Sequence, residues 1–343
     1  MGEFKMIDEI HETPNVMDRL VANESEKIKE IASELKRLSP SVIVATGRGT
    51  SDNACIYGQY LFGSELSIPV ALALGSLYTH YKRPPTLKNG VVIGISQSGE
   101  TEDVCEILKQ SIEQKTFTIG ITNNLNSTMA KLLKENTIFM NAGKEESVAA
   151  TKTFNASITT IAMLVYSMKE KPFDVKELKD IYDYIFKKEM EIESIAQRYT
   201  FAKDIIVLGT GFNYSIALES ALKLKETCYI SAQGLSSVDF VHGPMAILDP
   251  NIPVIIFAPD DSTLDLSLKV IEKIKNTGSH IFVLSDNDKA LEKGDLSFKL
   301  KKTRKEFYPF EIVLFAQIFA YNLSISKGLN PDLPRFLSKI SKV

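Results

Sequence analysis

The segment VVIGISQSGET, residues 91–101, decides the fold class of this chain. Its first five residues form an unbroken apolar run, which is typical of a strand buried on both faces. Hydroxyl side chains follow at once at Ser96, Ser98 and Thr101, and a helical pattern begins after them. A buried strand that passes through a short polar loop into a helix is the repeating unit of a parallel α/β sheet.

The same succession of strand, glycine and helix recurs along the chain. In the first half, apolar runs lie at residues 42–46 and 117–121. In the second half, runs at 205–208, 253–257 and 281–284 follow at comparable spacings. We interpret this as an internal duplication. The sequence therefore predicts two similar α/β domains, each a parallel sheet between two layers of helices.

Changes in composition and in hydrophobic pattern along the chain predict the domain limits. A charged helical segment covers residues 1–34, with an expected break at Pro14. The first domain is expected over 35–172 and the second over 196–330, joined within a charged helical stretch. A long apolar helix at 309–327 closes the second domain, and a short tail, 331–343, follows it.

The composition excludes several classes of protein. With 40 basic and 43 acidic side chains, a net charge of -3 and no basic stripe, nucleic acid is not an expected partner. Three widely spaced cysteines (Cys55, Cys105 and Cys228) indicate neither a disulfide framework nor a zinc site, and they fit a reducing compartment. No apolar run is expected to span a membrane, and no signal peptide is evident. We expect a cytoplasmic protein without a membrane partner and without a metal.

The loop at 96–101 has the chemistry of a phosphate site. Its three hydroxyls and its backbone N–H groups would converge at a helix N-terminus, where an anion is favoured. Gly99 would let the backbone approach the ligand closely. An ordinary helix cap is the alternative, but a cap needs only one hydroxyl. The segment 49–51 (GTS) holds the same position after the first strand, so both loops are expected to face one crevice. The glycines there lack dinucleotide-binding spacing, and no cofactor is expected.

In the second half, the stretch 217–226 reads as a helix that carries a row of charges. Glu219, Lys223 and Glu226 lie at offsets of zero, four and seven, so they share one face. On pattern alone, a solvated charged stripe is an alternative. His242 follows before Gly-Pro, which indicates a loop. A carboxylate and a nearby histidine are sufficient to act as general base and general acid in moving protons on and off carbon and oxygen.

Taken in this order, the segments resemble the isomerase half of glucosamine-6-phosphate synthase and related glucosamine-6-phosphate deaminases with two sugar isomerase (SIS) domains. The resemblance begins at residues 10–14 (IHETP), includes 148–152 (VAATK) and the segments above, and ends in the tail at 334–339 (PRFLSK). It covers nearly the whole chain. It implies two SIS domains of the flavodoxin-like, three-layer α/β/α kind.

The resemblance also implies roles for individual residues. Glu226 would shuttle a proton between C1 and C2 of the sugar, and Lys339 would meet the open-chain carbonyl. His242 would assist ring opening and would reach the site of a neighbouring subunit, which implies a homodimer. The residues that would contact the sugar phosphate are Thr50, Ser51, Ser96, Gln97, Ser98, Thr101, Val148, Lys223 and Ser338.

The sequence also departs from the family pattern. No glutamine-hydrolysing segment occurs in it. Gln233 and Asp239 replace glutamates that are usual between the catalytic glutamate and the histidine, and Ala150 replaces a serine that is usual near the sugar. The leading expectation is therefore isomerising deamination of glucosamine 6-phosphate to fructose 6-phosphate and ammonia. Alternatives are an ammonia-dependent synthase, a split synthase fed by a separate glutaminase subunit, or a related phosphosugar deglycase. A sugar-phosphate sensor is the non-enzymatic alternative, but it would need only the phosphate loops.

Overall fold

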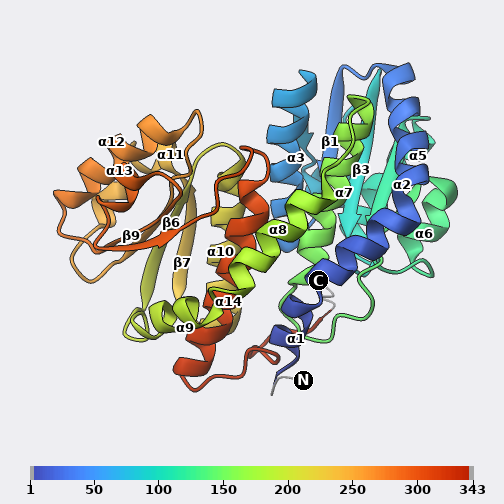
Figure 1. Cartoon of the computed structure of the whole chain (residues 1–343). Coiled ribbons are helices and arrows are strands. Elements are labelled where there is room, and N and C mark those ends of the chain that lie inside the picture. Colours follow the sequence, from blue (N-terminus) through green and yellow to red (C-terminus); the bar gives the residue numbers. More distant parts are fainter. Residues whose placement is uncertain (1–3, 340–343) are drawn as a thin grey trace. The chain divides into compact units, whose positions relative to one another are not determined.

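The structure, a computed structural model, describes residues 4–339 and is shown in Figure 1. The chain divides into two compact units. Among the described residues, the N-terminal unit comprises 11–175 with 336–339, and the C-terminal unit comprises 4–10 with 176–335. The first and the last described residues thus each group with the unit formed by the other half of the sequence. Residues 1–3 of the predicted helical segment and 340–343 of the predicted tail lie outside the described residues.

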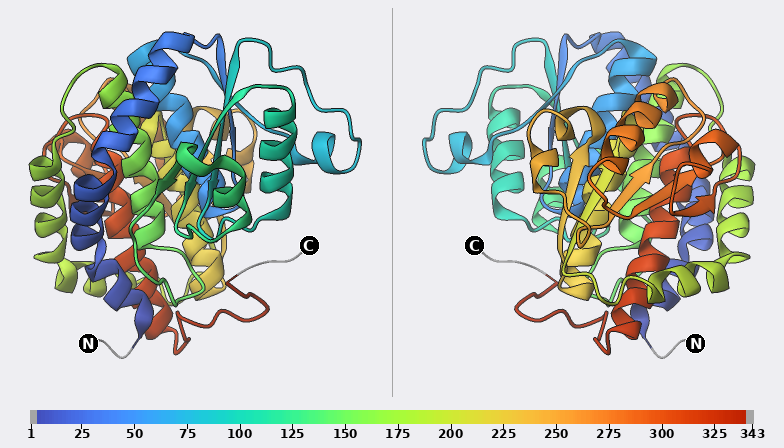
Figure 2. Two further views of the ribbon diagram at one scale, coloured as in Figure 1. Left: turned by 90° about the vertical axis from the view of Figure 1, so that its right-hand side faces the viewer. Right: turned by 90° about the vertical axis from the view of Figure 1, so that its left-hand side faces the viewer.

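The N-terminal unit contains a five-stranded parallel sheet in the order β2-β1-β3-β4-β5. Helices α2, α3 and α7 cover one face of it, and α4, α5 and α6 cover the other. In the left view of Figure 2, the blue helix α2 and the teal helix α5 lie on opposite sides of these strands. The strands are β1 (Val42–Thr46), β2 (Val70–Leu72), β3 (Gly90–Ser96), β4 (Phe117–Thr122) and β5 (Thr137–Phe139). The helices are α2 (Thr13–Leu38), α3 (Thr50–Leu66), α4 (Gly75–Thr79), α5 (Glu102–Glu113), α6 (Thr128–Leu133), the 3₁₀ turn η1 (Lys134–Asn136) and α7 (Lys152–Met168).

The C-terminal unit repeats this plan with strand order β10-β9-β8-β6-β7, again all parallel. Helices α9, α10 and α14 pack together on one face, and α11, α12 and α13 cover the other (Figure 1). The strands are β6 (Asp204–Gly209), β7 (Ser231–Ser236), β8 (Val254–Phe257), β9 (Ile281–Ser285) and β10 (Leu296–Lys299). The helices are α1 (Lys5–His11), α8 (Val175–Phe186), α9 (Glu189–Gln197), α10 (Phe212–Cys228), α11 (Ser237–Phe240), η2 (Pro244–Ile247), α12 (Leu264–Lys275), α13 (Asp288–Leu291) and α14 (Tyr308–Ser326). The predicted fold class, two parallel sheets flanked by helices, is confirmed.

Apolar runs identified the three inner strands of each sheet and missed the four edge strands. Inner strands are covered on both faces and by neighbours on both sides, so their residues are continuously apolar. Edge strands lack one neighbour, and in this protein they are either short or partly polar. β2 has three residues, β10 has four, and β7 reads SAQGLS with only partial burial. Nothing in such short or polar segments distinguishes a strand from a loop before the sheet has formed.

The break in the N-terminal helical segment lies at Glu12 and not at Pro14 as expected. Helix α1 ends at His11 and α2 begins at Thr13, so Pro14 lies in the first turn of α2. A proline is tolerated there because the N–H it lacks would have had no helical partner. Pro14, which suggested a break in the helix, therefore lies in the first turn of the second helix.

Helix α14 corrects the expectation that no segment is long and apolar enough to span a membrane. Its 19 residues pass that test by length and hydropathy, but 78% of its most apolar 18-residue window is buried inside the protein. A helix that is apolar all round and buried is a core helix. The carboxyl of Glu311 lies within it, where its Oε1 accepts a hydrogen bond of 2.6 Å from the Lys301 N–H. Burial raises the pKa of Glu311 to about 8, while Lys301 and Lys188 oppose the shift and Asp286 adds to it.

Candidate functional site

The loop between β3 and α5 gathers the predicted phosphate-binding hydroxyls. Ser96 Oγ lies 3.0 Å from Thr101 Oγ1 and accepts a 3.1 Å hydrogen bond from the Gly99 N–H. Ser98 Oγ accepts a 3.2 Å hydrogen bond from the Glu100 N–H. Ser96 is buried, whereas Gln97, Ser98 and Thr101 are half-buried. The structure thus brings the Ser96 and Thr101 hydroxyls together at the start of α5, with Ser98 in the same loop.

The carbonyl groups of this loop are occupied from the neighbouring segment, residues 123–129. Gln97 O accepts from the Asn123 N–H at 3.0 Å, and Gly99 O accepts from the Met129 N–H at 3.0 Å. Ser98 O accepts from the Asn124 side-chain amide at 3.4 Å. These bonds fix the direction of successive carbonyl dipoles, which would repel an anion if they turned toward it. The loop is therefore held in one conformation before any ligand binds.

Gly99 is required by both backbone conformation and space. Its φ of +66° is a conformation that side chains with a Cβ rarely adopt, and a Cβ there would lie 2.1 Å from Ser127 Oγ. The next residue, Glu100, accepts from the Thr128 N–H at 3.0 Å and from the Thr128 hydroxyl at 2.7 Å, at the start of α6. These bonds hold the pKa of the Glu100 carboxyl below its usual value. The loop thus packs directly on the beginning of a second helix.

The second predicted loop follows the carboxyl end of β1, on the same side of the sheet as the loop after β3, because β1 pairs with β3 in parallel and Thr46 lies opposite Gly94. Helix α3 begins at Thr50, and both Thr50 and Ser51 are half-buried. The Arg48 guanidinium forms an ion pair with Asp103 in the first turn of α5. This pair joins the two loops. Sequence reasoning missed it, although an arginine between two glycines at the end of a strand was the available signal.

The tail residue Lys339 lies in the N-terminal unit, beside the segment that carries Val148. Lys339 Nζ donates to Glu145 Oε2 at 2.7 Å and to Ser147 O at 2.6 Å. Val148 is half-buried, and the neighbouring tail residue Ser338 is exposed. Sequence reasoning placed Lys339 in the tail but did not identify its partner Glu145.

In the C-terminal unit, α10 holds a buried ionic group. Lys223 is fully buried, and its Nζ lies 3.3 Å from Glu219 Oε1 and 2.5 Å from Glu226 Oε2. The side chain of Glu219 is 1% exposed and that of Glu226 is 20% exposed. Burial would lower the pKa of Lys223, but the carboxylates of Glu219 and Glu226 outweigh burial and hold that pKa above its usual value. The alternative of a solvated charged stripe is therefore wrong for Glu219 and Lys223. Glu226 is the member of the group that reaches solvent.

His242 lies in an exposed loop after α11, where its N–H donates to Asp239 O at 3.1 Å. Gly243 follows with a φ of +144°, a conformation that favours glycine and sets the direction of the loop. Within residues 4–339, no hydrogen bond or ion pair joins the His242 side chain to the charged group on α10. The structure brings Lys223 and Glu226 together and leaves His242 separate from them.

The remaining reactive groups do not form a further site. Burial raises the pKa of the Cys105 thiol to about 11 and that of the Cys228 thiol to about 12, so neither is a nucleophilic thiolate near neutral pH. Among the residues that the structure describes, no group of three His, Cys, Asp or Glu side chains is placed to hold a metal ion.

Comparison with known proteins identifies the two repeated units. The family model of the SIS domain matches residues 39–167 and 199–327. Glutamine–fructose-6-phosphate aminotransferase (isomerizing) of Pyrococcus horikoshii is 33% identical over 98% of this chain, and this chain spans 57% of the length of that relative. The enzyme of the same name from Aquifex aeolicus is also 33% identical, over 98% of this chain and 58% of the relative.

Solved structures give the same result. The C-terminal domain of glucosamine-fructose-6-phosphate aminotransferase from Francisella tularensis is 27% identical, with a TM-score of 0.85 over 97% of this chain and 98% of that domain. Tagatose-6-phosphate ketose/aldose isomerase from Escherichia coli has a TM-score of 0.85 over 98% of this chain and 96% of that one. At 19% identity, this second likeness shows the fold alone. The matched families, the parallel sheets and the repeated plan agree, and this chain therefore belongs to the SIS domain family, with two copies of that domain.

Proposed function

We propose that this chain interconverts an amino-sugar phosphate and a ketose phosphate, and that its reaction is the isomerising deamination of glucosamine 6-phosphate to fructose 6-phosphate and ammonia. The observation that carries the proposal is the Glu226 carboxylate, held at 2.5 Å by a buried lysine and still partly open to solvent. Relatives that are 33% identical over nearly the whole chain are named for fructose 6-phosphate, amination and isomerisation. They support this substrate class.

The phosphate would bind at the loops 49–51 and 96–101. Both loops leave one sheet edge at the starts of α3 and α5, and they supply hydroxyls, N–H groups and helix N-termini in a fixed arrangement. Binding energy from the phosphate is remote from the reacting carbons, so it orients the sugar without hindering the reaction.

Glu226 would act as the base that moves a proton between C2 and C1 of the open-chain sugar. The proton taken from C2 is returned to C1, and a second proton passes from the nitrogen to the C1 oxygen, so the open-chain 2-amino aldose becomes the C2 imine of fructose 6-phosphate. Water then adds at C2, ammonia leaves, and fructose 6-phosphate remains. Lys223 would hold the Glu226 carboxylate in place through the charge-assisted hydrogen bond between them. Lys339 would meet the C1 oxygen or carbonyl, where a positive charge stabilises the developing enolate.

His242 would assist opening of the sugar ring. Its exposed loop is accessible to a second subunit, which supports our proposal that the protein acts as a homodimer in the cytoplasm with His242 contributed across the interface.

The second candidate is synthesis of glucosamine 6-phosphate from fructose 6-phosphate and ammonia. The printed names of the relatives favour it, with ammonia delivered from glutamine by a glutaminase on the same or a separate chain. The same side chains serve both directions, because forward and reverse reactions pass through the same intermediates. The supply of ammonia would then decide the direction.

The test is turnover by the purified chain. Incubation with glucosamine 6-phosphate should release ammonia and fructose 6-phosphate in equal amounts, and unphosphorylated glucosamine should react far more slowly. Fructose 6-phosphate with ammonium salt measures the reverse direction, and glutamine in place of ammonium measures a glutaminase. Glu226→Gln keeps the shape of the side chain but removes the base, so turnover should fall by about a hundredfold or more. Binding of either sugar phosphate without turnover in any of these assays would instead support a sensor.

A further inference from the structure

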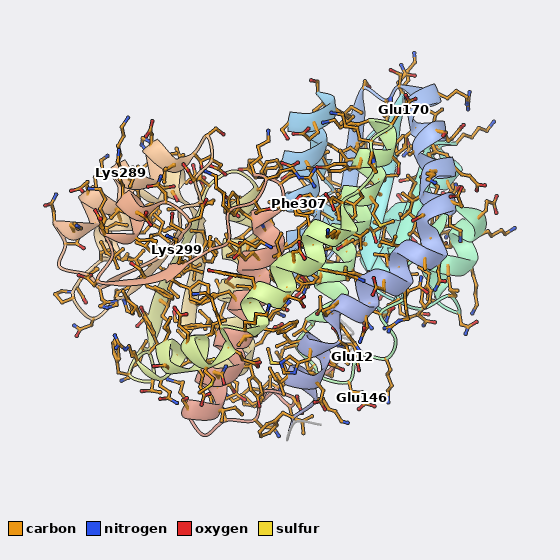
Figure 3. The ribbon with its side chains drawn as sticks, viewed as in Figure 1. Glu12, Glu146, Glu170, Lys289, Lys299 and Phe307 are labelled. Atoms are coloured by element: carbon orange, nitrogen blue, oxygen red, sulfur yellow. The ribbon has the colours of Figure 1, made fainter. Side chains whose placement is uncertain are left out.

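The carboxylate of Glu145 is buried in the loop between β5 and α7, although its sequence neighbour Glu146 is exposed. Glu145 Oε1 accepts from the Thr151 N–H at 2.9 Å and from the Thr153 N–H at 3.2 Å. Its Oε2 accepts from the Thr153 hydroxyl at 2.7 Å and from Lys339 Nζ at 2.7 Å. Glu146, labelled in Figure 3, pairs instead with Lys144 at 2.7 Å and is 41% exposed. Glu145 is thus an anion that the protein holds ready at the start of α7.

Hydrophobic burial contributes little to holding the described part of the tail on this unit. Residues 336–338 are all exposed, and Phe336 is 97% exposed, so hydrophobic burial does not hold them. Lys339 is half-buried and donates both to Glu145 and to Ser147 O. Without Lys339, Glu145 would keep hydrogen bonds but would lose its cation. This contact also changes the pKa of Glu145. Burial raises that pKa, but Lys339 and the N–H and hydroxyl donors outweigh burial and hold it below its usual value.

We propose that Glu145 is the docking point of the C-terminal tail and positions Lys339 for its reaction. The ion pair places the ammonium beside the segment that carries Val148. Two of the three N–H groups of an ammonium go to Glu145 and Ser147, and the third can donate to a sugar oxygen. Glu145 does not touch the sugar in this arrangement, so it is a positioning residue. This catalytic consequence rests on the proposed function, whereas docking of the tail does not.

Glu145→Gln is the decisive variant. The amide oxygen of glutamine can still accept from the N–H groups of Thr151 and Thr153, so the start of α7 keeps its partners. The amide nitrogen replaces Oε2 and cannot accept a hydrogen bond from an ammonium. Two matched controls exist. Glu146→Gln removes the adjacent exposed charge. Glu12→Gln breaks another lysine–carboxylate pair of the same unit, in which Lys152 Nζ donates to Glu12 Oε2 at 2.7 Å (Glu12 is labelled in Figure 3).

The first readout is the rate at which trypsin cleaves after Arg335 and Lys339, followed by mass spectrometry. Loss of a charge-assisted hydrogen bond should raise this rate in Glu145→Gln by about tenfold or more, and both controls should match the unaltered protein. If Glu145→Gln does not fold, Lys339→Gln removes the cation instead and should expose the bond after Arg335 to the same degree. Equal cleavage rates in the folded variants and the unaltered protein would overturn docking at Glu145.

The second readout is turnover of glucosamine 6-phosphate. Glu145→Gln should lower kcat strongly with little change in KM, because the phosphate loops are intact, and neither control should do so. Lys339→Arg should keep resistance to cleavage but lose kcat, since the planar guanidinium can pair with Glu145 yet cannot replace the compact ammonium that meets the C1 oxygen of the sugar. Faster cleavage with normal kcat would overturn the positioning role. Faster cleavage in a protein whose unaltered form has no turnover would refute the proposed function and leave the docking point established.

Discussion

Replacement of Lys223 by methionine tests the buried ionic group on α10. Methionine is close to lysine in length and fills the same space, but it removes the positive charge that pairs with Glu219 and Glu226. Glu219 is the more important of the two carboxylates for stability, because its side chain is 1% exposed and cannot be rescued by water. Glu226 is 20% exposed, so solvent compensates part of its loss.

The expected loss follows from this burial. Removal of one partner from a buried ion pair costs about 3–5 kcal/mol, since the other charge stays in a medium of low polarity. For a unit of this size, each kcal/mol lowers the unfolding temperature by about 2–4 °C, so Lys223→Met should lower it by roughly 6–20 °C. The double variant Glu219→Leu with Lys223→Met removes both buried charges, and it should regain most of that loss because well-packed apolar residues replace an ion pair at little cost.

The assay is urea unfolding followed by circular dichroism, with Lys29→Met as the matched control. Lys29 and Glu26 form a pair three residues apart on α2, like Lys223 and Glu226, but their side chains are 61% and 85% exposed. This control should change the free energy of unfolding by about 0.5 kcal/mol or less. A loss below about 1 kcal/mol in Lys223→Met, or no recovery in the double variant, would refute our account of α10 as a buried ionic group.

Three further predictions concern single sites. Burial raises the pKa of Glu311 to about 8, so the stability contributed by its protonated carboxyl is complete below the ordinary pKa of 4.5 and is lost as the pH rises through about 8. Glu311→Gln should remove this pH dependence of stability and raise the unfolding temperature measured at about pH 9. Gly99→Ala places a Cβ against Ser127 and should lower the free energy of unfolding by about 1–3 kcal/mol in urea titration, while a change below 0.5 kcal/mol would contradict the fixed loop. Ser98→Ala and Thr101→Val should each raise KM for glucosamine 6-phosphate by about tenfold, since each removes one hydroxyl from the proposed phosphate site. The circular dichroism spectrum should not change. An unchanged KM in both variants would mean that the phosphate binds elsewhere.

The sequence alone identified the parallel α/β plan and its duplication. Continuous apolar runs mark the inner strands because those residues must be apolar on both faces, whatever the details of packing. The loop at 96–101 could also be found in advance, since its hydroxyls are neighbours along the chain and a helix begins directly after them. Both features depend on residues that are close together along the chain, so the sequence alone predicts them.

Charged residues that meet across long distances could not be found in this way. Lys339 and Glu145 are 194 residues apart, and their pairing depends on where the tail returns to the N-terminal unit. The ion pair between Arg48 and Asp103 depends on the pairing of β1 with β3. Even where the sequence singles out one member of such a pair, as it does Arg48 and Lys339, nothing in it identifies the partner.

The tertiary structure also decided which charges are buried. The pattern of α10 placed Glu219, Lys223 and Glu226 on one face, but a charged face is most often solvated. Only packing of α10 against α14 and the sheet removes Lys223 from water and leaves Glu226 at the boundary. Spacing along a helix determines which side chains are neighbours, whereas exposure to water, and with it the strength of their electrostatic interaction, is determined by what packs over them.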